Sequence, residues 1–107
     1  MPTKYDCGGF VPSDDYTELT LKASGSSYTA THNGYVTFIK TSTAKDQYID
    51  IAASTISQIW STNQNEYLGT FVPIRKGKEF KISYTAGGTT QILKHYYNIG
   101  QTSIIKY

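Results

Sequence analysis

Hydrophobic and polar residues alternate in short stretches along most of the chain, and each stretch ends at a turn signal. The clearest alternation spans residues 79–85, where Phe80, Ile82 and Tyr84 are separated by lysine, serine and threonine. Strict alternation is typical of a half-buried β-strand, because successive side chains of a strand point to opposite faces. Patterns of this kind predict seven to nine strands, at residues 16–23, 26–30, 35–41, 47–53, 56–61, 67–74, 79–85, 91–98 and 103–107.

The stretch 35–41 differs from the others because it is apolar on both faces. Tyr35 and Ile39 point one way and Val36 and Phe38 the other, which predicts a central strand covered on both sides. Asn33-Gly34 directly before it is the strongest short hairpin signal in the chain, and it predicts a hairpin with the strand at 26–30.

Turn signals every 8–12 residues and the lack of a helical pattern predict an all-β protein, a single antiparallel β-sandwich or jelly roll. Residues 1–15 are expected to be a lead-in segment and residues 16–107 the sandwich domain. We detect no internal repeat. A chain of 107 residues has room for one modest core.

Composition supports the strand prediction. Isoleucine outnumbers leucine 11 to 4, and the chain contains 15 threonines. Branched and aromatic side chains fit a pleated, half-buried surface, so this composition argues against a helix bundle or a βαβ nucleotide-binding domain.

Charge and cysteine content narrow the function classes. A net charge of +2 predicts no nucleic-acid partner, and no apolar run is long enough to predict membrane insertion. The cluster Arg75, Lys76, Lys78 and Lys81 is read more simply as a solvated turn and a protected strand edge than as a phosphate site. Cys7 is the single cysteine, so it predicts neither an intramolecular disulfide nor a zinc site.

Groups that could catalyse a reaction are sparse. His32 and His95 lie far apart without metal-ligand spacing; His32 is read as a turn residue, and His95 either as a core histidine or as a site residue. Asp50 lies on a strand, but no second carboxylate flanks it as a glycosidase would require. We therefore expect a protein that is not an enzyme, with no catalytic residues, no cofactor and no metal.

Tyrosine is the unusual excess: the chain has 10. Tyrosine joins a large apolar contact area to a polar tip, and it therefore suits core packing, an oligomer interface or stacking against sugars. The stretch 51–65, around the single tryptophan Trp60, contains no charged residue, so it is a candidate subunit contact or polar-aromatic ligand surface.

Three groups of motifs resemble small tip domains of bacteriophage tail fibres. Residues 13–21, 23–30 and 33–36 (Asn-Gly-Tyr-Val) resemble the opening of these domains, and Val-Pro-Ile-Arg-Lys-Gly at 72–77 resembles the turn before one of their strands. Leu-Lys-His-Tyr-Tyr at 93–97, followed by Gly100, is similar to their closing strand. Two positions depart from the family pattern: Lys78 replaces a usual aspartate, and His95 replaces a usual apolar or aromatic residue.

This resemblance implies a jelly roll of the tumour-necrosis-factor and complement type that forms a homotrimer at the end of a fibre or spike. The implied function is adhesion of the virion to a bacterial surface polysaccharide or protein, in contact with other fibre proteins of the virion. The protein would be made in the host cytoplasm and be extracellular after release. For the trimer interface we expect Tyr84, Tyr96 and Tyr97; for the receptor or glycan contact we expect Trp60 and Tyr67, with the turns at 45–47 and 63–65.

Two alternatives stay open at the sequence level. One is a secreted bacterial carbohydrate-binding β-sandwich module that works as a monomer. The other is a purely structural decoration protein of the virion that binds nothing on the host.

Overall fold

The computed structural model describes residues 12–98, and these residues form an all-β structure without helices. The eight strands are β1 (Pro12–Glu18), β2 (Ser26–Thr29), β3 (Gly34–Thr41), β4 (Tyr48–Ala52), β5 (Ile56–Trp60), β6 (Tyr67–Ile74), β7 (Glu79–Tyr84) and β8 (Gln91–Asn98). Seven of the predicted strands, those that correspond to β2 to β8, are confirmed within one or two residues at each end. The predicted strand at 103–107 and Cys7 lie outside the described residues.

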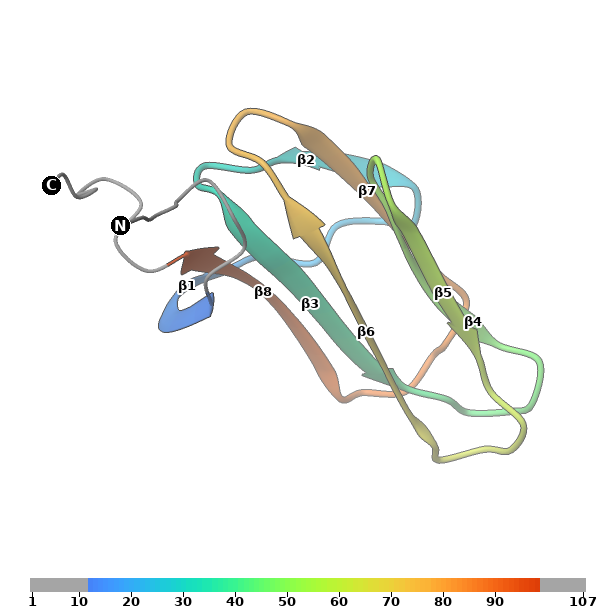
Figure 1. The fold of residues 1–107 in the computed structure, drawn as a ribbon. Helices are drawn as coiled ribbons and strands as arrows, with labels where there is room; N and C mark the ends of the chain where they lie inside the picture. The colour runs from blue at the N-terminus through green and yellow to red at the C-terminus, as the bar shows by residue number, and fades with distance from the viewer. Residues whose placement is uncertain (1–11, 99–107) are drawn as a thin grey trace, which may run out of the picture.

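The strands form two antiparallel sheets of four strands each, packed face to face as a β-sandwich (Figure 1). The first sheet has the order β1-β8-β3-β6, and the second has the order β2-β7-β4-β5. Among the described strands, only β4 and β5 are neighbours both in sequence and within a sheet. Every other connection between consecutive strands therefore crosses from one sheet to the other.

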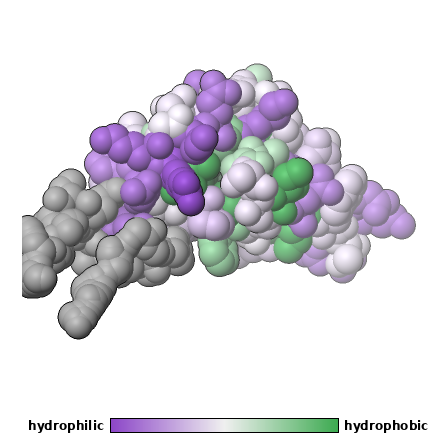
Figure 2. Space-filling model, turned by 45° about the horizontal axis from the view of Figure 1, so that its top comes forward, coloured by the Kyte–Doolittle hydropathy of each residue, from purple (hydrophilic) through white to green (hydrophobic). Residues whose placement is uncertain are grey.

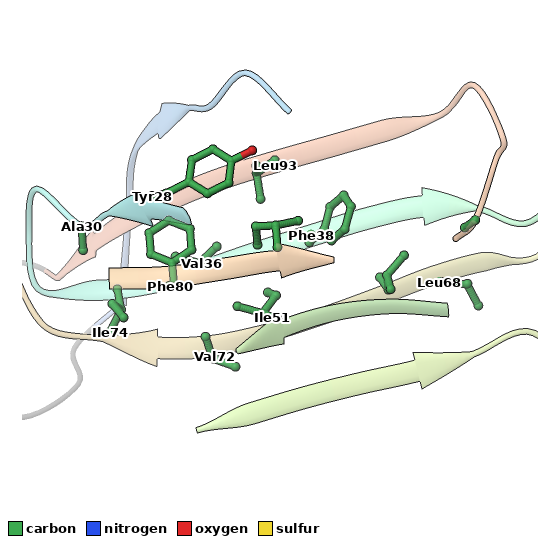
Figure 3. Packing of buried hydrophobic residues seen from close by; sticks show 13 residues of the cluster. Tyr28, Ala30, Val36, Phe38, Ile51, Leu68, Val72, Ile74, Phe80 and Leu93 are labelled. Carbon is green, nitrogen blue, oxygen red and sulfur yellow. The ribbon is translucent and has the colours of Figure 1, made fainter. Parts of the chain in front are cut away.

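Side chains from the inner faces of both sheets fill the space between them. Figure 3 shows Val36 and Phe38 from β3 on one side and Ile51 and Phe80 from the other sheet. Burial of each such side chain stabilises the fold by about 1.5–3 kcal/mol. The buried hydrophobic residues are Tyr28, Ala30, Val36, Phe38, Ile49, Ile51, Leu68, Val72, Ile74, Phe80, Ile82, Ala86 and Leu93.

The central strand β3 has the two faces that its sequence predicts. Val36 and Phe38 are fully buried between the sheets, whereas Tyr35, Thr37 and Ile39 point to the outer face of the first sheet and are partly buried there by their neighbours. β3 lies between β8 and β6 and pairs with both along its length.

The first strand lies earlier in the chain than its alternation predicts. β1 begins at Pro12, inside the segment expected to lead in, and it ends at Glu18. Residues 19–23 form no strand, although Leu19 and Leu21 pack against the core. Tyrosine hydroxyls hold their backbone instead: Tyr28 Oη accepts from the Lys22 amide at 2.7 Å, and Tyr84 Oη donates to the Lys22 carbonyl at 2.8 Å.

The predicted hairpin at Asn33-Gly34 is wrong. β2 belongs to the second sheet and β3 to the first, so residues 30–33 connect the two sheets. Gly34 is required for another reason: a Cβ there would collide with the backbone carbonyl of Tyr96 on the neighbouring strand β8. The glycine permits close approach of two backbones, and it does not provide a turn conformation.

Candidate functional site

Two loops cross between the sheets at the same end of the sandwich, and their sequences match. Residues 42–47 connect β3 to β4, and residues 61–66 connect β5 to β6. Residues 42–48 read Ser-Thr-Ala-Lys-Asp-Gln-Tyr, and residues 61–67 read Ser-Thr-Asn-Gln-Asn-Glu-Tyr. The expectation that the chain has no internal repeat is therefore wrong for these segments. The repeat is short and degenerate, and only the shared geometry makes it evident.

Each loop is closed by the same contact between its threonine and the residue four positions later. The Thr43 amide donates to Gln47 Oε1 at 2.7 Å, and the Thr62 amide donates to Glu66 Oε1 at 2.8 Å. Hydrogen bonds from the Thr62 hydroxyl and amide, with further ones from Asn63, lower the pKa of Glu66. Both loops also have one residue with a left-handed backbone, at equivalent positions: Asp46 and Asn65, with φ of 64° and 62°. Aspartate and asparagine tolerate this conformation better than most residues.

Two buried serines hold the two loops together, and we call this arrangement the serine clasp (Ser42 and Ser61). Ser42 Oγ donates to the Asn63 carbonyl at 2.6 Å and accepts from the Glu66 amide at 3.0 Å. Ser61 Oγ donates to the Ala44 carbonyl at 2.7 Å and accepts from the Gln47 amide at 3.0 Å. Each serine thus binds the opposite loop.

The backbone hydrogen bonds of the clasp are reciprocal in the same way, each loop binding the other. The Asp46 amide donates to the Ser61 carbonyl at 2.9 Å, and the Asn65 amide donates to the Ser42 carbonyl at 2.8 Å. Satisfied buried polar groups of this kind fix a single loop conformation. This end of the sandwich is therefore a rigid support for the side chains around it.

The clasp brings both sequence-predicted receptor residues, Trp60 and Tyr67, to this end of the molecule, because they flank the loop 61–66 directly. Trp60 is 52% exposed and Tyr67 is 75% exposed. They lie on different sheets: Trp60 pairs with Tyr48 on the second sheet, and Tyr67 pairs with Thr41 on the first. The predicted turns at 45–47 and 63–65 lie within the two loops.

The outer face of β4 and β5 combines an aromatic pair with polar groups. The rings of Trp60 and Tyr48 lie 4.9 Å apart at 39°. Trp60 Nε1 donates to Gln58 Oε1 at 2.9 Å, and Gln58 Nε2 donates to Asp50 Oδ2 at 3.0 Å. Asp50, considered above as a lone acid, is thus part of a chain of hydrogen bonds that ends at the indole.

The outer face of the first sheet is aromatic. Tyr16, Tyr96 and Tyr35 are opposite one another on β1, β8 and β3, and Phe71 on β6 adjoins them. The Tyr35 and Tyr96 rings stack 4.8 Å apart at 5°, and Tyr16 lies 5.2 Å from Tyr96. Phe71 meets Tyr35 edge to face at 6.0 Å and is 58% exposed. We call these four residues the aromatic row.

Of the three tyrosines expected at a subunit interface, only Tyr96 lies in the aromatic row. Tyr84 points to the core and meets Phe38 edge to face at 6.0 Å. Tyr97 lies on the same side of β8 as buried His95 and stacks on His32 at 3.8 Å. Sequence alternation alone could not identify Tyr35 and Phe71, because β3 and β6 have large apolar side chains on both faces. Tyr16 is not identified either, because β1 is mostly polar and gives no apolar pattern.

His95 is a core histidine, 2% exposed. Its Nε2 accepts from the His32 amide at 3.3 Å, so its ring proton lies on Nδ1, which faces the Tyr35 carbonyl at 3.2 Å. Burial lowers the pKa of His95, because the charged ring would lose its solvation. His32 and Tyr97 are its aromatic neighbours, with ring centroids 6.2 Å and 5.4 Å away.

The basic turn at residues 75–78 is a solvated turn, as its composition predicts. Gly77 has a φ of 84°, and all four residues of the turn are exposed. The Lys76 amide donates to Asn33 Oδ1 at 2.8 Å, which attaches this turn to the connection before β3.

Within residues 12–98, no group of three or more His, Cys, Asp or Glu is placed to hold a metal ion. That part of the chain also contains no helix long and apolar enough to cross a membrane.

Comparison with known proteins gives no relative. No family model matches the chain, and neither a curated protein nor a solved structure matches it significantly. The resemblance to fibre tip domains therefore depends on the short motifs given above.

Proposed function

We propose that the chain is a non-enzymatic tip domain of a bacteriophage tail fibre or spike, which forms a homotrimer and binds a polysaccharide or protein of the bacterial surface. In this proposal it works on the virion beside other fibre proteins, with a jelly-roll fold of the tumour-necrosis-factor and complement type. The strand pairing, the aromatic row and the loop end each support one part of the proposal.

The strand pairing supports the jelly roll. β1 pairs with β8, β2 with β7, β3 with β6, and β4 with β5. This nesting is what results when one long antiparallel ribbon folds over into two sheets, and eight strands in two such sheets are typical of jelly rolls. β3–β8 and β4–β7 pairing then completes each sheet.

The aromatic row is the observation that carries the proposal of self-association. It occupies the outer face of a sheet whose inner face already forms the core, and Tyr16 and Phe71 are 45% and 58% exposed. A contiguous exposed aromatic surface is typical of a protein interface. In a ring of three copies, each aromatic row would be buried against a neighbouring copy.

Trimerisation would also increase adhesion. Three equivalent loop ends on one rigid particle turn the second and third contacts with a surface into intramolecular events, so weak single sites become useful together. The serine clasp supports this role because it holds the candidate contact residues Trp60 and Tyr67 in fixed positions.

The solution mass tests the proposal. Sedimentation of the wild type should give about three times 11.9 kDa, the mass of one chain. Tyr96→Asp places a charge in the aromatic row and should give a mass near that of one chain. Ser27→Asp introduces the same charge on the outer face of β2, in the second sheet, and should stay trimeric. A monomeric wild type would contradict the proposed assembly.

Binding to cells tests the adhesion itself. Fluorescently labelled trimer should coat at least one strain in a panel of bacteria, and Trp60→Ala with Tyr67→Ala should reduce the coating. A trimer that coats no strain would instead favour a structural decoration protein of the virion.

The Trp60–Tyr48 pair supports one second candidate, a secreted bacterial carbohydrate-binding module. Exposed aromatic rings beside a carboxylate and an amide are suited to sugars whether or not the chain forms a trimer. A monomer that binds a glycan would favour this candidate over the fibre tip.

A further inference from the structure

We propose that the outer face of β4 and β5 is a saccharide-binding site, where a neutral hexose ring stacks on Trp60 and its hydroxyl groups bind Gln58 and Asp50. This inference rests on the adhesion function proposed above, and it assigns the class of receptor: a neutral polysaccharide.

The Trp60 ring is held in place before any ligand arrives. Its indole N–H donates to Gln58 Oε1 at 2.9 Å, and Tyr48 supports it with a ring 4.9 Å away. About half of the side chain, 52%, is nevertheless exposed. The face of an aromatic ring carries partial negative charge, which attracts the weakly positive C–H face of a pyranose. Because the indole is already ordered, binding costs little side-chain entropy.

The groups beside the ring are those that bind sugar hydroxyls. Gln58 uses one amide hydrogen for Asp50 and its carbonyl oxygen for Trp60, so a second amide hydrogen and a further acceptor position remain. The Asp50 carboxylate has several acceptor positions and receives the one hydrogen bond from Gln58. Ser83 is opposite Asp50 on β7 and extends the same row with a hydroxyl group.

The spacing between Trp60 and Gln58 along β5 matches the size of a single sugar. Gln58 precedes Trp60 by two residues on β5, which is about 6.8 Å along an antiparallel strand. A hexose ring centred on Trp60 would therefore place its equatorial hydroxyls above the row of Gln58 and Asp50.

Charge favours a neutral ligand over an anionic one. Asp50 is the single charged residue among residues 48–60, the two strands and their connecting turn. A carboxylate beside the stacking surface repels phosphate or uronate groups, and the nearest cation in register, Lys81, is opposite Ala52, one row beyond Asp50. On the face drawn in Figure 2, strongly hydrophobic side chains form separate patches among polar ones.

The match between residues 42–48 and residues 61–67 allows the residues next to the two loops to be compared position by position. It equates the Trp60–Tyr48 pair with the Thr41–Tyr67 pair on the first sheet. One row further along, Gln58–Asp50 corresponds to Ile39–Gly69. The same backbone framework thus carries hydrogen-bonding groups on one sheet and apolar ones on the other, so the polar chemistry beside Trp60 is specific to that face.

Fluorescence of the single tryptophan reports this site directly. The full chain is titrated with neutral trisaccharides of glucose, galactose and N-acetylglucosamine, and with glycerol 3-phosphate as an anionic polyol. At least one trisaccharide should change the emission with saturation, and glycerol 3-phosphate should not. If no trisaccharide changes the emission, or if glycerol 3-phosphate alone does, the proposal is overturned.

Variants localise the binding by the same fluorescence assay. Asp50→Ala and Gln58→Ala should each weaken the affinity for the trisaccharide about tenfold or more, the loss expected when a charge-assisted or network hydrogen bond is removed. Ser27→Ala, at an exposed position on β2 in the same sheet, should leave the affinity unchanged. Circular dichroism and solution mass verify that each variant is folded. Wild-type affinity in both Asp50→Ala and Gln58→Ala would overturn the site.

Cell binding separates this site from the adhesion function. If the wild type and Asp50→Ala coat bacteria equally, the saccharide site is wrong while adhesion stands. If the wild type binds a trisaccharide through Asp50 but coats no strain, the site stands and the proposed adhesion fails.

Discussion

Acidification should destabilise the fold through His95 well above the pH at which carboxylates titrate. The ring is 2% exposed, and its Nε2 accepts a hydrogen bond from the His32 amide. A proton added at Nε2 would remove this acceptor and leave a charge in the core. Burial therefore lowers the pKa of His95 in the folded state, whereas in the unfolded chain the group has its ordinary value of 6.5.

The direction and the size of this change in stability with pH follow from proton binding. Below pH 6.5 the unfolded chain binds a proton that the folded chain binds less readily, so stability falls as the pH falls. One proton changes the free energy of unfolding by about 1.4 kcal/mol per pH unit at most. Between pH 6.5 and about pH 5 the loss due to His95 is at most about 2 kcal/mol. Glu66, whose pKa is lowered from 4.5, contributes only in more acidic solution.

Urea unfolding at fixed protein concentration, followed by circular dichroism between about pH 7.5 and pH 5, measures this loss. His95→Gln keeps a polar side chain at the position without a titrating ring, so its stability should be nearly flat over this range. His32→Asn removes the other histidine and retains His95, so it should keep most of the wild-type slope. If His95→Gln loses stability on acidification as steeply as the wild type does, titration of His95 is not the cause of the loss.

The remaining predictions concern close backbone approach and the serine clasp. Gly34→Ala should destabilise the fold by about 3 kcal/mol or more, because its Cβ collides with a backbone carbonyl that cannot move freely. Gly69→Ala is the matched control, because its Cβ would meet only Ile39 at 3.6 Å. Its free energy of unfolding, measured by thermal denaturation, should differ from that of the wild type by less than about 1 kcal/mol. Ser42→Ala and Ser61→Ala should each lower the free energy of unfolding, measured with urea, by about 1–3 kcal/mol and by similar amounts, because each removes a buried hydroxyl that bonds partly buried backbone groups of the opposite loop. A neutral effect of either substitution would show that the clasp does not hold the loops.

Much of the fold follows from local patterns, and the exceptions have physical causes. Alternation at 79–85 predicts β7 because one face of that strand is buried. The same rule misplaces the first strand, because β1 pairs through its backbone while its side chains are largely exposed. Past Glu18, tyrosine hydroxyls bind the backbone of Thr20 and Lys22 in place of a neighbouring strand. Asn33-Gly34 is misread because a glycine needed for close packing has the same sequence signal as a glycine needed for a turn.

The candidate sites are less accessible to sequence reasoning. Trp60 and Tyr67 are identified as exposed aromatics, but sequence cannot show that they lie on different sheets. Tyr48 and Gln58 become relevant only through pairing of β4 with β5. The signal for the serine clasp is present in the sequence as two matching segments 19 residues apart, residues 42–48 and 61–67. Its meaning depends on the reciprocal hydrogen bonds.

The order of strands within the sheets has a consequence for how the chain acquires its structure during synthesis. β7 lies between β2 and β4, and β8 lies between β1 and β3, so one of the two interior positions in each sheet is filled by a strand that is among the last two of the described strands to be synthesised. Until then only β3–β6 and β4–β5 can pair, while β1 and β2 expose unpaired backbone edges. Such long-range pairing makes folding slow. The second sheet can therefore be completed only after β7 is synthesised, and the first only after β8, so the nascent chain is most vulnerable to aggregation before these two strands are available.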